Sequence, residues 1–189
     1  KHFVVTRQEV DEFIAWFNDN DAYPDYSVPL SILNWPGNGV NGDYQFLAPY
    51  FDANDDGEYN PNDGDYPKYD IEGNLDCNND DLIYGDQTLY WIFNDKGNIH
   101  SETGADPIGL EIRAQAFAFA TNDEINNMTF YNYELINRGT QTLYDTYFAQ
   151  YLDADVGNYA DDYAGCDVSR GLGYMFNGDL NDENDGGKL

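Results

Sequence analysis

Residues 108–121 read IGLEIRAQAFAFAT, and this stretch decides the fold class. Its residues alternate between two faces, as successive side chains do along a β-strand. One face would carry Leu110, Ile112, Ala114, Ala116 and Ala118, and the other Glu111, Arg113, Gln115, Phe117 and Phe119. The face of small alanines would let a second layer approach closely.

Four further segments have the composition of strands: 88–94, 129–137, 143–152 and 171–176. The second and third are rich in aromatic residues and are joined by a short loop at 138–141, which predicts a hairpin. Long antiparallel strands with few helices are typical of a β-sandwich. We therefore predict a mainly β protein, an antiparallel β-sandwich with an N-terminal helix and long calcium-binding loops.

The predicted helix follows Thr6. Thr6 and Glu9 have the capping-box spacing, and one apolar face follows at Val10, Phe13, Ile14 and Phe17. We expect one structural domain, a fragment of a longer chain. Its predicted parts are an N-terminal helix and irregular arm (1–50), an acidic calcium-loop segment (51–87), sandwich strands with a second acidic loop (88–178) and an acidic tail (179–189).

The charge balance narrows the choice of partner. Of the 189 residues, 36 are Asp or Glu and 8 are Lys or Arg, so the formal net charge is −28. This excludes nucleic acid, because phosphate binding needs Lys and Arg, and it argues against an anionic membrane surface. No apolar segment is long enough to cross a bilayer. Aromatic residues make up 16% of the chain, too many for a disordered tail, so we expect a folded domain that binds cations.

Residues 52–63 (DANDDGEYNPND) have the spacing of a twelve-residue calcium loop. Oxygen-bearing side chains fall at positions 1, 3, 5, 9 and 12, and Gly57 falls at position 6, where the chain must turn sharply. The predicted ligands are Asp52, Asn54, Asp56, Glu58 through its carbonyl, Asn60 and Asp63. Asp63 replaces the usual Glu, and no helix is expected on either side. The alternative interpretation is a solvated acidic loop.

A second acidic group follows residue 152. Four acids within ten residues repel one another unless a cation or hydrogen-bond donors compensate, so we predict a second calcium site. Its ligands would be Asp153, Asp155, Asp161 and Asp162, with Asp167 nearby. Hydrogen-bonded turns are the alternative. A third candidate, 76–81, lacks the glycine of a calcium loop.

The residues give little support for catalysis. Glu111 and Glu134 could be the paired carboxylates of a glycosidase, but such strand residues are more often exposed positions or partners of arginines, here Arg113 and Arg138. We therefore expect no enzyme. The tryptophans and the many tyrosines leave a carbohydrate-binding module as an alternative.

The two cysteines, Cys77 and Cys166, are compatible with one disulfide in an oxidising compartment and equally with two buried thiols.

A set of spaced motifs resembles a domain found in large secreted proteins of Bacteroidota. The motifs span about residues 35–177 and include Asn34-Trp35-Pro36, Leu47-Ala48-Pro49-Tyr50-Phe51-Asp52, Asp56-Gly57-Glu58-Tyr59-Asn60-Pro61, Gly64-Asp65-Tyr66-Pro67, Gly85-Asp86-Gln87, Trp91-Ile92-Phe93-Asn94-Asp95, His100, Gly109-Leu110-Glu111, Asn132-Tyr133, Asp153-Ala154-Asp155-Val156-Gly157 and Asp161-Asp162-Tyr163-Ala164-Gly165-Cys166-Asp167.

The resemblance implies export by the type IX secretion system to the cell surface or medium, as one module of a longer protein. It names no reaction. Cys77 lies in an insertion outside the pattern, which argues against a bridge to Cys166. We expect a calcium-stabilised extracellular structural or adhesive module whose partners are other domains of the same chain or surface proteins, with glycans as an alternative partner.

Overall fold

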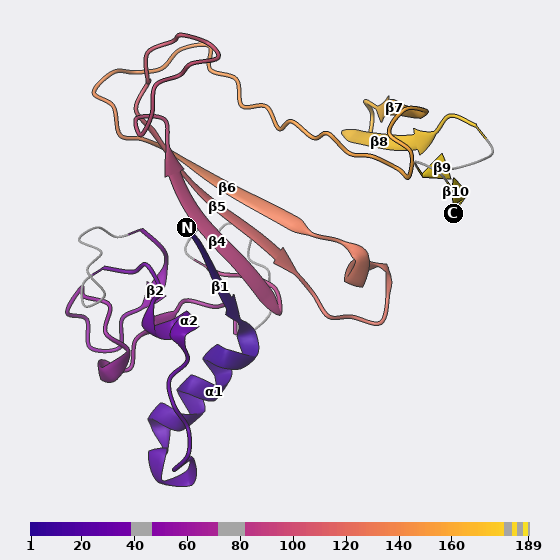
Figure 1. The fold of residues 1–189 in the computed structure, drawn as a ribbon. Coiled ribbons are helices and arrows are strands. Elements are labelled where there is room, and N and C mark those ends of the chain that lie inside the picture. Colours follow the sequence, from indigo (N-terminus) through magenta and orange to yellow (C-terminus); the bar gives the residue numbers. More distant parts are fainter. Residues whose placement is uncertain (39–46, 72–81, 180–182, 185–186, 189) are drawn as a thin grey trace. The chain divides into compact units, whose positions relative to one another are not determined.

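The computed structural model describes residues 1–38, 47–71, 82–179, 183–184 and 187–188 (Figure 1). The chain divides into two compact units, Lys1–Thr142 and Leu143–Leu189. The described residues form several antiparallel sheets and few helices, so the mainly β prediction is confirmed. Among them, no helix combines the length and the apolar character needed to cross a membrane.

The predicted N-terminal helix is present as α1 (Arg7–Asn18). Both halves of the capping box form, since the Glu9 N–H donates to Thr6 Oγ1 (3.2 Å) and the Thr6 N–H donates to Glu9 Oε2 (2.8 Å). Val10 and Phe13 are buried on its apolar face. The short helices η1 (Asn20–Ala22) and α2 (Leu30–Leu33) follow.

The first unit is built on one four-stranded antiparallel sheet in the order β1-β4-β5-β6 (Figure 1). Its strands are β1 (His2–Thr6), β4 (Gln87–Asn94), β5 (Leu110–Ala118) and β6 (Phe130–Asn137). The predictions of β4, β5 and β6 are confirmed, and no strand end differs from its prediction by more than three residues. Strand β1 was not predicted, because five residues at the start of the chain show too short an alternation.

One face of this sheet lies on the hydrophobic core. Val5 of β1 and Tyr90 of β4 are buried there with Val10 and Trp35. Strand β5 has buried residues on both faces, Arg113 and Gln115 on one and Ile112, Ala114 and Ala116 on the other. Its central place in the sheet accounts for this pattern.

Two short strands hold the acidic segment. β2 (Tyr50–Phe51) and β3 (Tyr66–Pro67) pair antiparallel, and the 3-10 helix η2 (Pro61–Asp63) lies between them in sequence. Since β2 and β3 pair, the two ends of the connecting segment 52–65 lie close together. A further 3-10 helix, η3 (Glu124–Asn127), precedes β6.

In the second unit, β7 (Asp162–Asp167) pairs with β8 (Leu172–Asn177), and β9 (Glu183–Asn184) pairs with β10 (Gly187–Lys188). The last predicted strand, 171–176, is therefore confirmed as β8.

The strand predicted over 143–152 is wrong, and so is its hairpin with 129–137, because no strand forms there and β6 pairs with β5. Tyr147 and Tyr151 are 91% and 87% exposed. Alternating aromatic residues favour a strand only where a neighbour accepts its backbone hydrogen bonds.

Candidate metal centre

The acidic loop after β2 turns around the N–H groups of Asp56 and Gly57. The Asp52 carboxylate accepts both, Oδ1 from Asp56 at 3.2 Å and Oδ2 from Gly57 at 2.8 Å. Asn54 Oδ1 accepts the same Asp56 N–H at 3.1 Å. Side-chain oxygens from predicted ligand positions 1 and 3 therefore meet at one point of the backbone.

Positive φ angles produce this turn. Asp55 has φ 59° and Gly57 has φ 79°, a backbone region that favours Asp, Asn and Gly. Asp56 Oδ1 then accepts the Glu58 N–H at 2.8 Å. Gly57 at position 6 thus makes the sharp turn that a calcium loop requires.

The last two predicted ligands form a separate pair. Asn60 Nδ2 donates to Asp63 Oδ2 at 2.6 Å, while Asn60 Oδ1 accepts the Asn62 N–H at 3.1 Å as the cap of η2. The six predicted ligands therefore fall into one group around Asp56 and another around Asn60.

Asp65 was missed by the sequence reasoning, although it ties the two ends of the loop together. It is fully buried, and its two carboxylate oxygens accept the N–H groups of Ala53 and Asn60, each at 2.9 Å. Burial raises the pKa of Asp65 despite these two bonds, and the Asp52 and Asp56 charges raise it further. The motif Gly64-Asp65-Tyr66-Pro67 directly after the loop was the available signal.

Tyr59 fixes the loop to the core. It is fully buried, its hydroxyl donates to the Ile32 carbonyl at 2.7 Å, and its ring lies edge-on to Tyr50 at 5.3 Å between centroids. Burial raises the pKa of Tyr59, so the hydroxyl stays protonated and remains a donor. Position 8 of the predicted loop is thus a core residue.

The second acidic group lies at the start of β7. Asp162 Oδ2 accepts the Val156 N–H at 2.8 Å. The Oδ1 atoms of Asp161 and Asp162 are both shielded from solvent and have no hydrogen-bond partner. Asp153 and Asp155 are exposed. This group therefore contains two carboxylate oxygens that lack both water and a donor.

Asp167 does not join them. It lies five residues from Asp162 along β7, about 16 Å in an extended strand. Its Oδ2 accepts from Arg170 at 3.0 Å and its Oδ1 accepts from Ser169, and these bonds lower the pKa of Asp167. Its carboxylate is already compensated by donors.

Two other predictions fall wholly or partly outside the described residues. The third acidic candidate, 76–81, lies there, and so does Cys77. Cys166 is an exposed free thiol, not a buried one.

Across the described part of the chain, no three His, Cys, Asp or Glu side chains gather closely enough to hold a metal ion by themselves. A cation in the first loop would therefore also need amide and carbonyl oxygens. Asn54, Asn60 and the Glu58 carbonyl offer these, and calcium accepts such oxygens.

Glu111 and Glu134 are held by arginines. Glu111 Oε1 lies 3.1 Å from Arg113 Nε and 3.1 Å from Arg138 Nη2, and Glu134 Oε2 lies 3.4 Å from Arg113 Nη1. Burial raises the pKa of Glu111, but the ion pairs with Arg138 and Arg113 outweigh it and hold the pKa below its usual range. The pairing with Arg113 and Arg138 weighed in the sequence analysis is confirmed.

Replacing Glu111 with glutamine is expected to lower the free energy of unfolding by about 1 kcal/mol at pH 7. Because the folded-state pKa of Glu111 is depressed, its contribution is present above the unfolded pKa, about 4.3, and is lost as the pH falls through the folded value. The difference between the variant and the parent chain should therefore shrink below about pH 4. Urea unfolding at pH 7 and pH 3 measures it, and a constant difference would contradict the ion-pair account.

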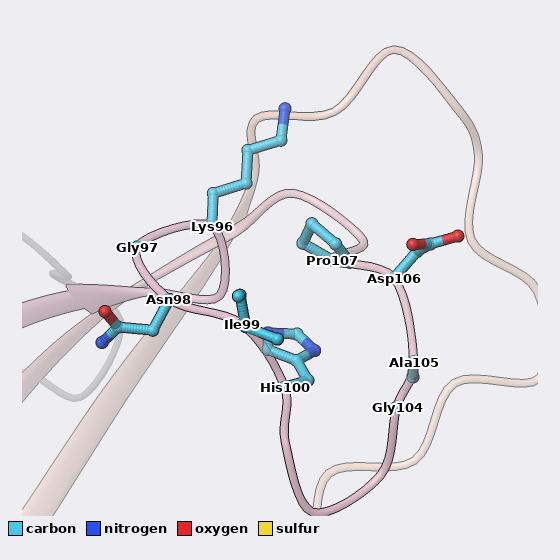
Figure 2. Close-up of a pocket in the computed structure, with 9 residues that line it drawn as sticks. All are labelled: Lys96, Gly97, Asn98, Ile99, His100, Gly104, Ala105, Asp106 and Pro107. Atoms are coloured by element: carbon cyan, nitrogen blue, oxygen red, sulfur yellow. The ribbon is translucent and has the colours of Figure 1, made fainter.

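The β4–β5 loop forms an open hollow of about 450 Å³ (Figure 2). His100 contacts the Asp95 carbonyl through Nε2 at 2.7 Å, and the Asp95 carboxylate accepts N–H groups of residues 108, 109 and 110. Burial raises the pKa of Asp95, but these three bonds lower it by more. In Figure 2 the Lys96 and Asp106 side chains extend away from the hollow, so its charged groups do not converge on a ligand.

Comparison with known proteins adds no identity, since the chain matches no family model, no curated protein and no solved structure.

Proposed function

We propose that this chain is a calcium-stabilised extracellular module with a structural or adhesive role in a larger secreted surface protein. The turn at Gly57 carries the proposal. Asp52 and Asn54 direct their oxygens to one backbone amide there, and the glycine takes a positive φ.

The first ion would be bound by Asp52, Asn54, Asp56, the Glu58 carbonyl, Asn60 and Asp63. Calcium needs six to eight oxygens, and this set supplies them if the group around Asp56 and the pair at Asn60 close on one ion. The two hydrogen bonds accepted by the Asp65 carboxylate support such closure, because they already hold Ala53 beside Asn60. Asp63 is shorter than the usual Glu, so a water molecule would complete the shell.

A second ion would be bound at Asp161 and Asp162, with Asp153 and Asp155 as further ligands. The support is the pair of shielded Oδ1 atoms without partners. A carboxylate oxygen that loses water without gaining a donor is destabilising, and a divalent cation would remove that penalty.

The extracellular setting and the export route rest on the family resemblance of the motifs between residues 35 and 177. The acidic surface is consistent with this setting, where free calcium is plentiful enough for weak sites. Other domains of the same long chain and surface proteins are the proposed partners. The β-sandwich stays a prediction, since the described residues of the first unit contain a single four-stranded sheet and one two-stranded sheet.

Removing calcium should lower the melting temperature of the first unit. An ion bound only by the folded state stabilises it by about 2.7 kcal/mol at one hundred times its dissociation constant, which corresponds to a shift on the order of 10 °C. Trp16, Trp35 and Trp91 all lie in the first unit, so tryptophan fluorescence follows its melting. The melt is measured in calcium, in excess EDTA and in EDTA with magnesium.

Magnesium should restore little, because it demands a smaller and more regular shell. An unchanged melt in EDTA, with no metal found by elemental analysis, would refute the calcium proposal.

A further inference from the structure

The stretch between β6 and β7 contains an exposed run without helix or strand (Figure 1). Every residue from 144 to 152 is exposed. Tyr144 and Leu152, at the two ends of this run, are each 82% exposed, and Tyr147 and Tyr151 within it are more exposed still. We call residues 144–152 the exposed segment.

The exposed segment is not anchored by the described part of the chain. With the exception of Phe148, its residues make no hydrogen bond, ion pair or ring contact with the described residues. The nearest printed bonds lie outside it, from Asn137 Nδ2 to the Gln141 carbonyl and from the Val156 N–H to Asp162 Oδ2. A stretch of backbone that forms so few bonds becomes accessible at almost no cost in free energy.

The side chains of the exposed segment are aromatic and almost uncharged. Residues 146–152 read TYFAQYL and carry no charge, although 23% of the chain is charged. No Lys or Arg occurs between Arg138 and Arg170. An endopeptidase whose S1 pocket accepts Lys or Arg therefore finds no site in this stretch, whereas an enzyme with an apolar S1 pocket finds several.

We propose that the exposed segment is a processing site for an extracellular endopeptidase with an apolar S1 pocket. Exposed segments of this kind are the preferred sites of proteolytic cleavage. The enzyme would bind the segment as an added extended strand, through its main-chain groups, and would take one aromatic side chain into the pocket. Both requirements are met without the opening of any described helix or strand.

The reaction is a hydrolysis that consumes one water molecule. The C–N bond after Tyr147, Phe148 or Tyr151 breaks, the carbonyl carbon gains the hydroxyl group, and the nitrogen gains the proton. The cut separates the four-stranded sheet from the β7–β8 hairpin and divides no strand. The extracellular location of the enzyme rests on the proposed function, but the position of the cleavage site does not.

Two tyrosines in strands show why side-chain exposure alone does not make a cleavage site. Tyr131 of β6 is 55% exposed and pairs with Ala116, and Tyr163 of β7 is 60% exposed and pairs with Phe176. A protease reaches their backbone only after the strand has left its partner, which lowers the accessible population. Tyr131 and Tyr163 are therefore internal controls within the same chain.

The test is limited digestion of the whole chain with chymotrypsin in calcium, followed by intact-mass measurement of the products. The first cut should fall within the exposed segment. It should be at least about a hundredfold faster than the cuts after Tyr131 and Tyr163. The same first cut is expected in EDTA, because none of the proposed calcium ligands lies in the exposed segment. Loss of the calcium proposal therefore leaves this result unchanged.

A variant that removes the aromatic side chains tests the role of the S1 pocket. Tyr144→Ser, Tyr147→Ser, Phe148→Ser and Tyr151→Ser combined should slow the cut in the exposed segment about tenfold or more. Tyr163→Ser is the matched control, because it removes an exposed tyrosine outside the segment, and it should leave that rate unchanged. Tryptophan fluorescence melting of both variants reports whether the first unit still folds.

A first cut outside residues 144–152 overturns the proposal, and so does a cut there no faster than the cut after Tyr131. An exposed segment that resists digestion in the native chain would show that polypeptide covers it, which also overturns the proposal. Equal slowing by the combined variant and by Tyr163→Ser would show that the aromatic side chains of the segment do not direct the enzyme.

Discussion

Replacing Tyr59 with alanine is expected to lower the free energy of unfolding of the first unit by about 3–5 kcal/mol. Tyr59 is fully buried in the same cluster as Trp35 and Val10, and its ring contacts Tyr50. Truncation removes the buried ring and leaves a cavity that the surrounding side chains fill only in part. Urea unfolding followed by tryptophan fluorescence measures the loss.

Tyr59→Phe separates the ring from the hydroxyl. It keeps the packing but removes the hydroxyl that donates to the Ile32 carbonyl, which still accepts the Trp35 N–H, so it should cost about 1 kcal/mol. Tyr23→Ala, on the exposed surface, should change the free energy of unfolding by less than about 0.5 kcal/mol. Equal losses in Tyr59→Ala and Tyr59→Phe would show that the ring is not packed as described.

The burial of Tyr59 also connects the core to the proposed metal centre. Tyr59 lies between the turn at Gly57 and the Asn60 cap, so its buried ring helps to hold the loop's shape together with the Asp65 hydrogen bonds. Calcium binding should therefore stabilise the core through this residue, and loss of the ring should weaken calcium binding as well.

The sequence correctly predicted the features that depend only on residues close together in the chain. The capping box at Thr6 and Glu9 and the alternation in β5 each need only neighbouring residues, and both appear in the structure. The turn of the acidic loop at Gly57 is local in the same sense, since a positive φ at position 6 follows from glycine.

Features that depend on distant partners were not predicted. Strand β1 forms because it pairs with β4, where Val4 lies opposite Leu89. Asp65 matters because the loop folds back onto it, which no spacing within the loop reveals. The stretch 143–152 shows the reverse case: its aromatic alternation favours a strand, but no neighbouring strand pairs with it in the described residues.

Replacing Asp52 with asparagine is expected to lower the calcium affinity of the first loop at least about a hundredfold. Loss of an outer partner of a metal ligand already costs 10- to about 100-fold in affinity, and Asp52 is proposed as a direct ligand at position 1. The substitution also places an amide N–H₂ against either the Asp56 or the Gly57 N–H, both of which now donate to the carboxylate.

Asp55→Asn is the matched control for this variant. It removes the same charge from the same loop, and asparagine tolerates the positive φ of 59° at this position. Asp55 occupies position 4, where a calcium loop has no ligand, so only the long-range Coulomb attraction is lost and the affinity should fall a fewfold at most.

Calorimetric titration with calcium compares the calcium affinities of Asp52→Asn and Asp55→Asn. If both variants lose affinity equally, the loop attracts calcium only through its overall negative charge. The calcium-site interpretation is then wrong, and the loop is the solvated acidic loop of the alternative interpretation. If Asp52→Asn alone loses binding, the position of the oxygen decides the affinity, because the net charge of the two variants is identical.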